Sequence, residues 1–153
     1  MNIVLFEPEI APNTGNIIRL CANTGFRLHL IEPLGFDMEE KKLRRAGLDY
    51  AEYAQVKRYT NLEAFKAEHP ELKLFAFTTK ASQFHTEAQY DSKSALLFGP
   101  ETRGLPDELI QSLPDDQRIR LPMLPERRSL NLSNAVAIAT YECWRQFGFA
   151  NAT

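Results

Sequence analysis

Short apolar runs alternate with amphipathic stretches along the chain. Residues 2–6 and 28–31 are apolar runs, each followed by a glutamate and a proline, which is typical of buried parallel strands. Between them, Pro12 and Asn13 mark the start of a helix, and Gly25 marks its end. A strand, a helix and a second strand within about thirty residues predict a βαβ unit.

The same alternation continues to the end of the chain. It predicts further strands at residues 72–78, 95–98 and 118–121, and helices at residues 38–46, near residues 62–68 and after Pro106. The last helix is the longest, with apolar positions recurring along one face: Leu132, Val136, Ala139, Cys143 and Phe147. The pattern predicts an α/β fold, with a mostly parallel sheet and helices on both faces, in one domain that spans residues 1–153.

Charge and cysteine content narrow the possible functions. The 18 basic and 20 acidic residues give a net charge of −2, which disfavours a polycationic nucleic-acid binder, so any contact with RNA must come from a local patch. Cys21 and Cys143 lack the spacing of a redox or metal site, and we expect buried, reduced thiols. The histidines also lack metal-ligand spacing, so no metal is expected. The chain opens with a strand and has no apolar run of membrane-spanning length, from which we expect a cytoplasmic protein with no membrane partner.

Three polar segments accompany the predicted strands and helices. They are residues 13–19 (NTGNIIR), 97–104 (LFGPETRG) and 129–135 (SLNLSNA). Gly99 and Gly104 allow a tight turn close to a ligand, but neither of the usual phosphate-binding glycine patterns is present, so a dinucleotide or nucleoside triphosphate is not indicated. The third segment can cap the last helix, although one capping residue suffices and the segment supplies four. We expect the three segments to form one composite site.

In this order and spacing, the three segments resemble motifs 1, 2 and 3 of the SPOUT class of knotted, adenosylmethionine-dependent RNA methyltransferases. Within that class the chain resembles the small bacterial tRNA (cytidine/uridine-34) 2'-O-methyltransferases from Ile3 to about Phe149, including Glu7-Pro8-Glu9 and residues 44–50 (RRAGLDY). The resemblance implies the SPOUT fold, with a deep trefoil knot near the C-terminus that sequence pattern alone does not reveal. It also implies methylation of the ribose 2'-hydroxyl of nucleotide 34, the wobble position, in leucine tRNAs.

The cofactor implied by the resemblance is S-adenosylmethionine. Its adenine needs backbone donors and acceptors in an apolar slot, and its sulfonium tolerates no nearby cation, which suits loops rich in exposed backbone. By the resemblance, the residues that contact the cofactor are Phe77, Thr78, Gly99, Glu101, Gly104, Leu121, Met123, Ser129, Leu130, Asn131 and Ala135. Glu101 has the alternative role of organising the turn.

The resemblance assigns the catalytic roles to Arg19 and Asn16. Methyl transfer to a hydroxyl is an in-line displacement, so alignment and help with the hydroxyl proton are the main requirements. Arg19 is the expected base, but a guanidinium group is protonated at ordinary pH and does not readily accept a proton. Stabilisation of a developing alkoxide is the easier role. The alternative for Arg19 is a solvated charge on a helix. Asn16 is expected to orient the substrate or the loop.

A cluster of cations predicts a surface for the anticodon loop of tRNA. Lys41, Lys42, Arg44 and Arg45 lie on a short predicted helix, followed by a loop with Tyr50 and Tyr53. Cations contact phosphates and aromatic rings stack on unpaired bases, although pairing with Glu39 and Glu40 would make the same helix an ordinary solvated face. Beside the third motif, Arg127 and Arg128 are expected to reach the substrate.

We expect no separate RNA-binding extension, and the resemblance implies a homodimer. The expected interface uses the first and last helices, with Trp144 and Phe147 supplying apolar area, and in that arrangement Arg19 can serve the cofactor of the other subunit. Two alternatives remain open. One is the same reaction at another tRNA or ribosomal RNA ribose, and the other is a non-catalytic RNA-binding module with the same fold.

Overall fold

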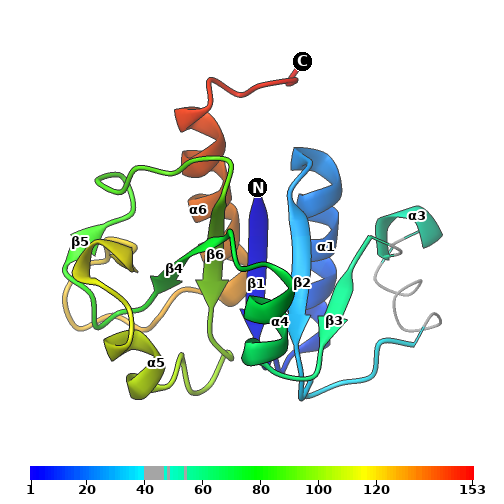
Figure 1. Cartoon of the computed structure of the whole chain (residues 1–153), viewed down its shortest axis with the longest axis horizontal. Helices are drawn as coiled ribbons and strands as arrows, with labels where there is room; N and C mark the ends of the chain where they lie inside the picture. The colour runs from blue at the N-terminus through cyan, green and yellow to red at the C-terminus, as the bar shows by residue number, and fades with distance from the viewer. Residues whose placement is uncertain (40–46, 48, 54) are drawn as a thin grey trace.

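The computed structural model describes residues 1–39, 47, 49–53 and 55–153, and these residues contain a seven-stranded sheet (Figure 1). Its strands are β1 (Asn2–Phe6), β2 (Arg27–Ile31), β3 (Lys57–Tyr59), β4 (Lys73–Phe77), β5 (Gln83–Phe84), β6 (Ser94–Phe98) and β7 (Arg118–Arg120). They are ordered β3-β2-β1-β6-β4-β7-β5, and each described pairing is parallel. The predicted parallel sheet is confirmed.

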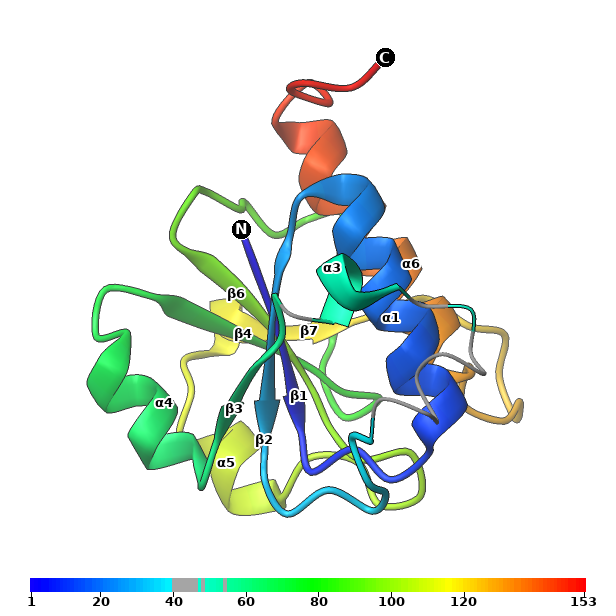
Figure 2. The ribbon, with the colours of Figure 1, turned by 90° about the vertical axis from the view of Figure 1, so that its right-hand side faces the viewer.

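Helices cover both faces of this sheet, as predicted. The helices are α1 (Ala11–Thr24), α3 (Tyr50–Tyr53), α4 (Leu62–Glu68), α5 (Asp107–Gln111) and α6 (Leu132–Gln146), together with the 3-10 turn η1 (Asp115–Gln117). Figure 2 shows α4 and α5 on one side of the sheet and α1 and α6 side by side on the other. Within the described residues, no helix combines the length and apolar character needed to cross a membrane.

Two apolar cores follow from the alternation of side chains along each strand. In β1, Ile3 and Leu5 belong to the core under α1 and α6, whereas Val4 belongs to the core under α4 and α5. All three side chains are fully buried, and burial of an aliphatic side chain of this size contributes about 1.5–3 kcal/mol to stability. Cys21 and Cys143 are buried free thiols, as expected.

The ends of α1 and α6 lie where the polar and glycine signals predict them. Pro12 occupies the first turn of α1, and Gly25 ends the helix with φ +78° while its N–H donates to the Cys21 carbonyl at 2.8 Å. In α6 the Asn131 side chain accepts from the N–H groups of Ser133 and Asn134. The capping role of the third segment is therefore confirmed.

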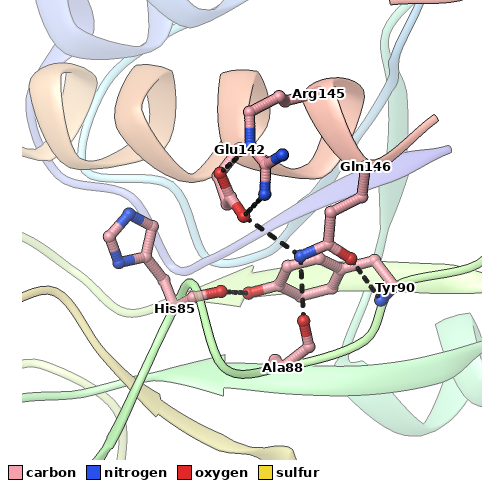
Figure 3. Close-up of polar contacts among 6 residues, drawn as sticks. All are labelled: His85, Ala88, Tyr90, Glu142, Arg145 and Gln146. Atoms are coloured by element: carbon pink, nitrogen blue, oxygen red, sulfur yellow. Dashed lines mark hydrogen bonds and ion pairs between the residues drawn. The ribbon is translucent and has the colours of Figure 1, made fainter. Parts of the chain in front are cut away.

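The segment between β5 and β6 is fastened to the C-terminal half of α6 (Figure 3). Gln146 donates through Nε2 to the Ala88 carbonyl at 2.9 Å and accepts through Oε1 from the Tyr90 N–H at 3.1 Å. The Tyr90 hydroxyl donates to the His85 carbonyl at 2.9 Å. Beside them, the carboxylate of Glu142 binds both Arg145 and Gln146. One side chain of the last helix, Gln146, thus holds a stretch with little regular structure, and Glu142 in turn holds Gln146.

The structure corrects the sequence interpretation around residues 38–60. Tyr50 and Tyr53 bound the short helix α3, where a loop was predicted. The predicted helix over residues 38–46 lies outside the described residues from residue 40 onward, and residues 38 and 39 are not helical. Two short strands, β3 and β5, were not predicted, because neither has enough residues to show an alternating pattern.

Candidate functional site

The strand order places a site at the carboxyl ends of the central strands. The chain runs outward from β1 through β2 to β3 and then continues on the other side of β1, where β6 is its neighbour. In open parallel sheets, ligands bind where the strand order reverses in this way. The loops that leave β1 and β6 at this point are residues 7–10 and 99–106.

A cavity of about 380 Å³ lies beside these loops, where β4, β6 and β7 end. It brings together all eleven residues that the sequence interpretation assigned to the cofactor, which are Phe77, Thr78, Gly99, Glu101, Gly104, Leu121, Met123, Ser129, Leu130, Asn131 and Ala135. Ile10 and Asn13 from the start of α1 complete one side. The second and third polar segments therefore meet at one cavity, as predicted, and the first segment reaches it through Asn13 alone.

The cavity combines an apolar wall with backbone-lined loops. The rings of Phe77 and Phe98 stack in this wall, with centroids 4.6 Å apart and planes 17° from parallel. Gly99 faces the backbone of the same loop so closely that an added Cβ would lie 2.3 Å from the Leu105 nitrogen. Gly104 has φ +68°, which glycine adopts without strain. The glycines let the loop turn back on itself and leave its backbone beside the cavity.

Glu101 connects this loop to the start of α1. Its carboxylate accepts from the N–H of Glu9 at 2.8 Å, from the N–H of Ile10 at 2.6 Å and from Asn13 Nδ2 at 3.3 Å. Ile10 is the N-cap residue of α1 and has no capping side chain of its own. A carboxylate from a distant loop therefore binds the two backbone N–H groups that directly precede α1 and lies near the positive end of that helix. Glu101 lines the cavity, but its polar atoms are engaged in holding the turn.

Glu9 makes the reciprocal connection. Its Oε1 accepts from the Thr102 N–H at 2.9 Å and from Thr102 Oγ1 at 2.7 Å, and its Oε2 lies 3.9 Å from Arg103 Nε. The hydrogen bonds from Thr102 lower the pKa of Glu9, so the side chain is a carboxylate at neutral pH. Each loop thus donates backbone N–H groups to a carboxylate of the other.

The third segment joins through a pair of asparagines. Asn131 donates through Nδ2 to Asn13 Oδ1 at 3.0 Å, while its own Oδ1 caps α6. Asn13 is 6 % exposed and binds Glu101 with its amide nitrogen. We refer to Glu9, Asn13, Glu101, Thr102 and Asn131 as the loop clasp.

Three members of the loop clasp, Glu9, Asn13 and Thr102, were not among the residues assigned to the cofactor or to catalysis. Asn13 and Thr102 were included only as members of the polar segments, Asn13 also as a helix start, and Glu9 only as part of the resemblance. Their partners lie about ninety residues or more along the chain, and no local pattern encodes such pairs. A buried asparagine in the first turn of a helix was the one available signal, because buried amides need partners.

The predicted catalytic residues lie apart from the cavity within one chain. Asn16 and Arg19 are one turn apart on the exposed side of α1, and neither lines the cavity. Arg19 is 48 % exposed, binds the Gly47 carbonyl and forms an ion pair with Glu52, at 3.4 Å between Nε and Oε2. The structure therefore brings the predicted cofactor residues together but leaves the predicted catalytic residues, Asn16 and Arg19, away from them.

The predicted RNA contacts are only partly described. Lys41, Lys42, Arg44 and Arg45 lie outside the described residues. Arg127 and Arg128 are exposed in the loop between β7 and α6, next to the cavity residue Ser129.

Two cations that the sequence interpretation did not assign also line the cavity. Lys80 is paired with Asp107, and Arg103 lies close to Glu9. Both carry carboxylate partners, so the mouth of the cavity is less positive than its lysine and arginine alone suggest.

Comparison with known proteins gives consistent results. The model of the SpoU rRNA Methylase family matches residues 1–141. The chain is 60 % identical over 152 residues to a tRNA (cytidine(34)-2'-O)-methyltransferase of Aeromonas hydrophila, covering 99 % of this chain and 97 % of the relative. It is 58 % identical over 153 residues to the protein of the same name from Escherichia coli K12, with the same coverages.

Solved structures agree with the sequence relatives. One, described as giving structural insights into the 2-OH methylation of C/U34 on tRNA, has a TM-score of 0.88 and 41 % identity, covering 97 % of this chain and 96 % of that one. The AdoMet-bound rRNA methyltransferase of Sinorhizobium meliloti has a TM-score of 0.81 and 26 % identity, covering 94 % of this chain and 55 % of that one. The fold, the three converging loops and these similarities together establish that the chain belongs to the SpoU rRNA methylase family.

Proposed function

We propose that the protein is a tRNA methyltransferase that transfers a methyl group from S-adenosylmethionine to the ribose 2'-hydroxyl of nucleotide 34, a cytidine or a modified uridine. The observation that carries this proposal is the convergence of the three polar segments on one cavity at the carboxyl ends of β4, β6 and β7. The relatives that share more than half of the residues over nearly the whole chain support the same reaction. By the resemblance, leucine tRNAs are the proposed substrates, and the cytoplasm is the proposed location.

The residues that line the cavity fit adenosylmethionine. About 380 Å³ lies within the range of small-molecule sites, and the Phe77 and Leu121 side chains offer apolar surface for an adenine. The loop at residues 99–104 offers backbone groups for hydrogen bonds, and Ser129 and Asn131 are the polar side chains on the opposite wall. Bound in this cavity, adenosylmethionine supplies the methyl group on a sulfonium, which is an electrophile.

The protein's own contribution is alignment and charge stabilisation. Arg19 is proposed to hold the phosphate next to the target ribose and to stabilise the oxygen of its hydroxyl as the proton leaves. Asn16, one turn earlier on the same exposed side of α1, is proposed to orient the ribose. Arg127 and Arg128 are proposed to contact the tRNA backbone beside the cavity, together with Lys41, Lys42, Arg44 and Arg45.

A homodimer would reconcile the proposed catalytic role of Arg19 with its position away from the cavity of its own chain. The outer side of α6 exposes Ile138 (43 %) and Tyr141 (47 %), and α6 packs beside α1. Trp144 and Phe147, which were expected to form the interface, are half-buried against their own core, so Ile138 and Tyr141 are the better candidates. Two copies joined through α1 and α6 would bring Arg19 of one subunit to the cavity of the other.

We also propose the trefoil knot that the resemblance implies. The loop over residues 121–131 runs from β7, near one edge of the sheet, to α6, which packs on α1 and on the central strand β6. A crossing of this kind is compatible with a knot formed by the last segment.

The function is tested with purified protein, labelled adenosylmethionine and total tRNA from a strain that lacks the activity. The labelled nucleotide is mapped by nuclease digestion and mass spectrometry, and we expect label on the ribose of nucleotide 34. Label at another ribose would keep the chemistry and overturn the target. Tight cofactor binding without label would favour an RNA-binding role or a missing partner.

A further inference from the structure

We propose that Glu9 is a positioning residue for the cofactor, which holds the loop over residues 99–104 in place through Thr102 and neutralises Arg103 beside the cavity. The inference rests on the proposed function, since it takes adenosylmethionine as the ligand. Glu9 itself does not line the cavity, so the effect must act through the loop.

Glu9 holds the loop over residues 99–104 at Thr102. One oxygen of Glu9 accepts both the backbone N–H and the hydroxyl of Thr102, at 2.9 and 2.7 Å. Thr102 lines the cavity, and so do its neighbours Glu101 and Arg103. Hydrogen bonds to a charged acceptor are stronger than neutral ones, so this contact fixes the backbone of a cavity loop.

The turn that carries Glu9 is itself held by β2 and by the segment that follows β2. The Gly35 N–H donates to the Pro8 carbonyl at 2.9 Å, and a Cβ on Gly35 would lie 2.8 Å from the Glu9 Cα. Glu7 has φ +49°, an unusual conformation for a residue with a side chain, and its N–H donates to the Ile31 carbonyl at 3.0 Å. The turn over residues 7–9 is therefore packed against the end of β2 and the segment after it. This packing fixes the position of Glu9 relative to the loop over residues 99–104.

Glu9 also acts through its charge, on Arg103. Arg103 Nε lies 3.9 Å from Glu9 Oε2, and both side chains are partly solvated, at 59 % and 29 % exposure, so the ion pair is weak. Arg103 lines the cavity in which a sulfonium is proposed to bind. An unpaired guanidinium there would repel the positive sulfur of adenosylmethionine but not the neutral sulfur of S-adenosylhomocysteine. The contact of Glu9 with Thr102 should therefore favour the binding of both molecules. The neutralisation of Arg103 by Glu9 should favour the binding of adenosylmethionine alone.

The experiment measures the dissociation constants of both molecules by calorimetry for full-length Glu9→Gln, Glu9→Ala and Glu9→Gln/Arg103→Gln. In Glu9→Gln an amide oxygen can still accept from Thr102. We expect the dissociation constant to rise about two- to fivefold more for adenosylmethionine than for adenosylhomocysteine. The second substitution, Arg103→Gln, should remove that difference. In Glu9→Ala we expect both molecules to bind about tenfold more weakly. Glu63→Gln, an exposed change on α4, is the matched control.

The outcomes separate a positioning role from a merely structural one. Equal losses for the two molecules in Glu9→Gln, or unchanged affinities in every variant, would overturn the proposal. Thermal unfolding of each variant ensures that binding is measured on folded protein. If Glu9→Ala does not fold, the difference between the two molecules in Glu9→Gln still tests the proposal. Failure of the unsubstituted protein to bind either molecule would instead remove the proposed function, and this inference with it.

Discussion

At the scale of single residues, Asn131 has two separable contacts. Its oxygen caps α6, and its amide nitrogen donates to Asn13 in the loop clasp. Asn131→Asp keeps the capping oxygen and loses the donor, so we expect the unfolding free energy to change by less than about 1 kcal/mol. Cofactor affinity should fall about tenfold, because the loop clasp loses a partly buried hydrogen bond to the buried Asn13. Calorimetric titration and urea unfolding measure the two effects.

Asn131→Ala is the companion variant. It loses the cap as well as the link to Asn13, and the expected loss of unfolding free energy is about 1–2 kcal/mol. If Asn131→Asp is as unstable as Asn131→Ala, the two contacts are not separable and this interpretation of Asn131 is wrong.

His29 gives a second prediction, for the dependence of stability on pH. The side chain is 4 % exposed, with Nδ1 2.9 Å from the Tyr59 hydroxyl and Nε2 2.9 Å from Asn2 Oδ1. Burial, with a smaller contribution from the charge of His69, lowers the pKa of His29 to about 4. In the unfolded chain, the His29 side chain therefore becomes protonated near pH 6.5, whereas in the folded chain it becomes protonated only near pH 4. Stability is retained above pH 6.5 and falls between pH 6.5 and 4, by about 3 kcal/mol from this group.

The variant that checks this prediction is His29→Gln. It cannot titrate, so the loss of unfolding free energy between pH 6.5 and 4.5 should be smaller than in the unsubstituted protein. Urea unfolding at several pH values gives both curves. If the unfolding free energy falls with pH in the same way in both proteins, groups other than His29 cause the loss of stability at low pH.

At the scale of elements, Gln146 is expected to carry much of the contact between α6 and the segment over residues 85–90. Its side chain pairs the Ala88 carbonyl and the Tyr90 N–H, both in buried residues (Figure 3). Gln146→Ala leaves these groups unpaired, and we expect the unfolding free energy to fall by about 1–3 kcal/mol. Cofactor affinity should stay unchanged, because this segment does not line the cavity. Gln89→Ala, at an exposed position nearby, is the control.

The elements also show what the sequence could predict. Helix α6 was predicted because Leu132, Val136, Ala139 and Cys143 recur at helical spacing, and all four are buried. β5 was missed because two residues show no period, and it is an edge strand held by a single neighbour. Local periodicity records which face of an element is buried, so it predicts long elements and fails for short ones.

The composition of the cavity could be predicted, whereas its internal bonding could not. The three segments stood out because each concentrates small polar residues near a strand or helix end, and parallel strands bring such ends to one edge. The pairing of Glu9 with Thr102 depends on the angle between two loops and leaves no trace in either local sequence. The position of Arg19 away from the cavity likewise follows from three-dimensional packing alone.

At the scale of the whole molecule, the distance between Arg19 and the cavity predicts that one chain is not a complete enzyme. Arg19→Ala removes the proposed catalytic cation and keeps the cavity. Gly99→Ala disrupts the cavity, since a Cβ there would lie 2.3 Å from the Leu105 nitrogen, and keeps Arg19. Each variant alone is expected to lose methylation. A heterodimer of the two, purified through different tags, contains one cavity faced by an intact Arg19 if that residue acts across the interface.

That heterodimer should therefore recover about half of the activity of the unsubstituted dimer per molecule, because one of its two sites is complete. If Arg19 acts within its own chain, neither site is complete and the heterodimer stays inactive. Analytical ultracentrifugation of the unsubstituted protein supplies the remaining comparison. A monomer that methylates tRNA at full rate would exclude the shared site and would require α1 to move toward its own cavity when tRNA binds.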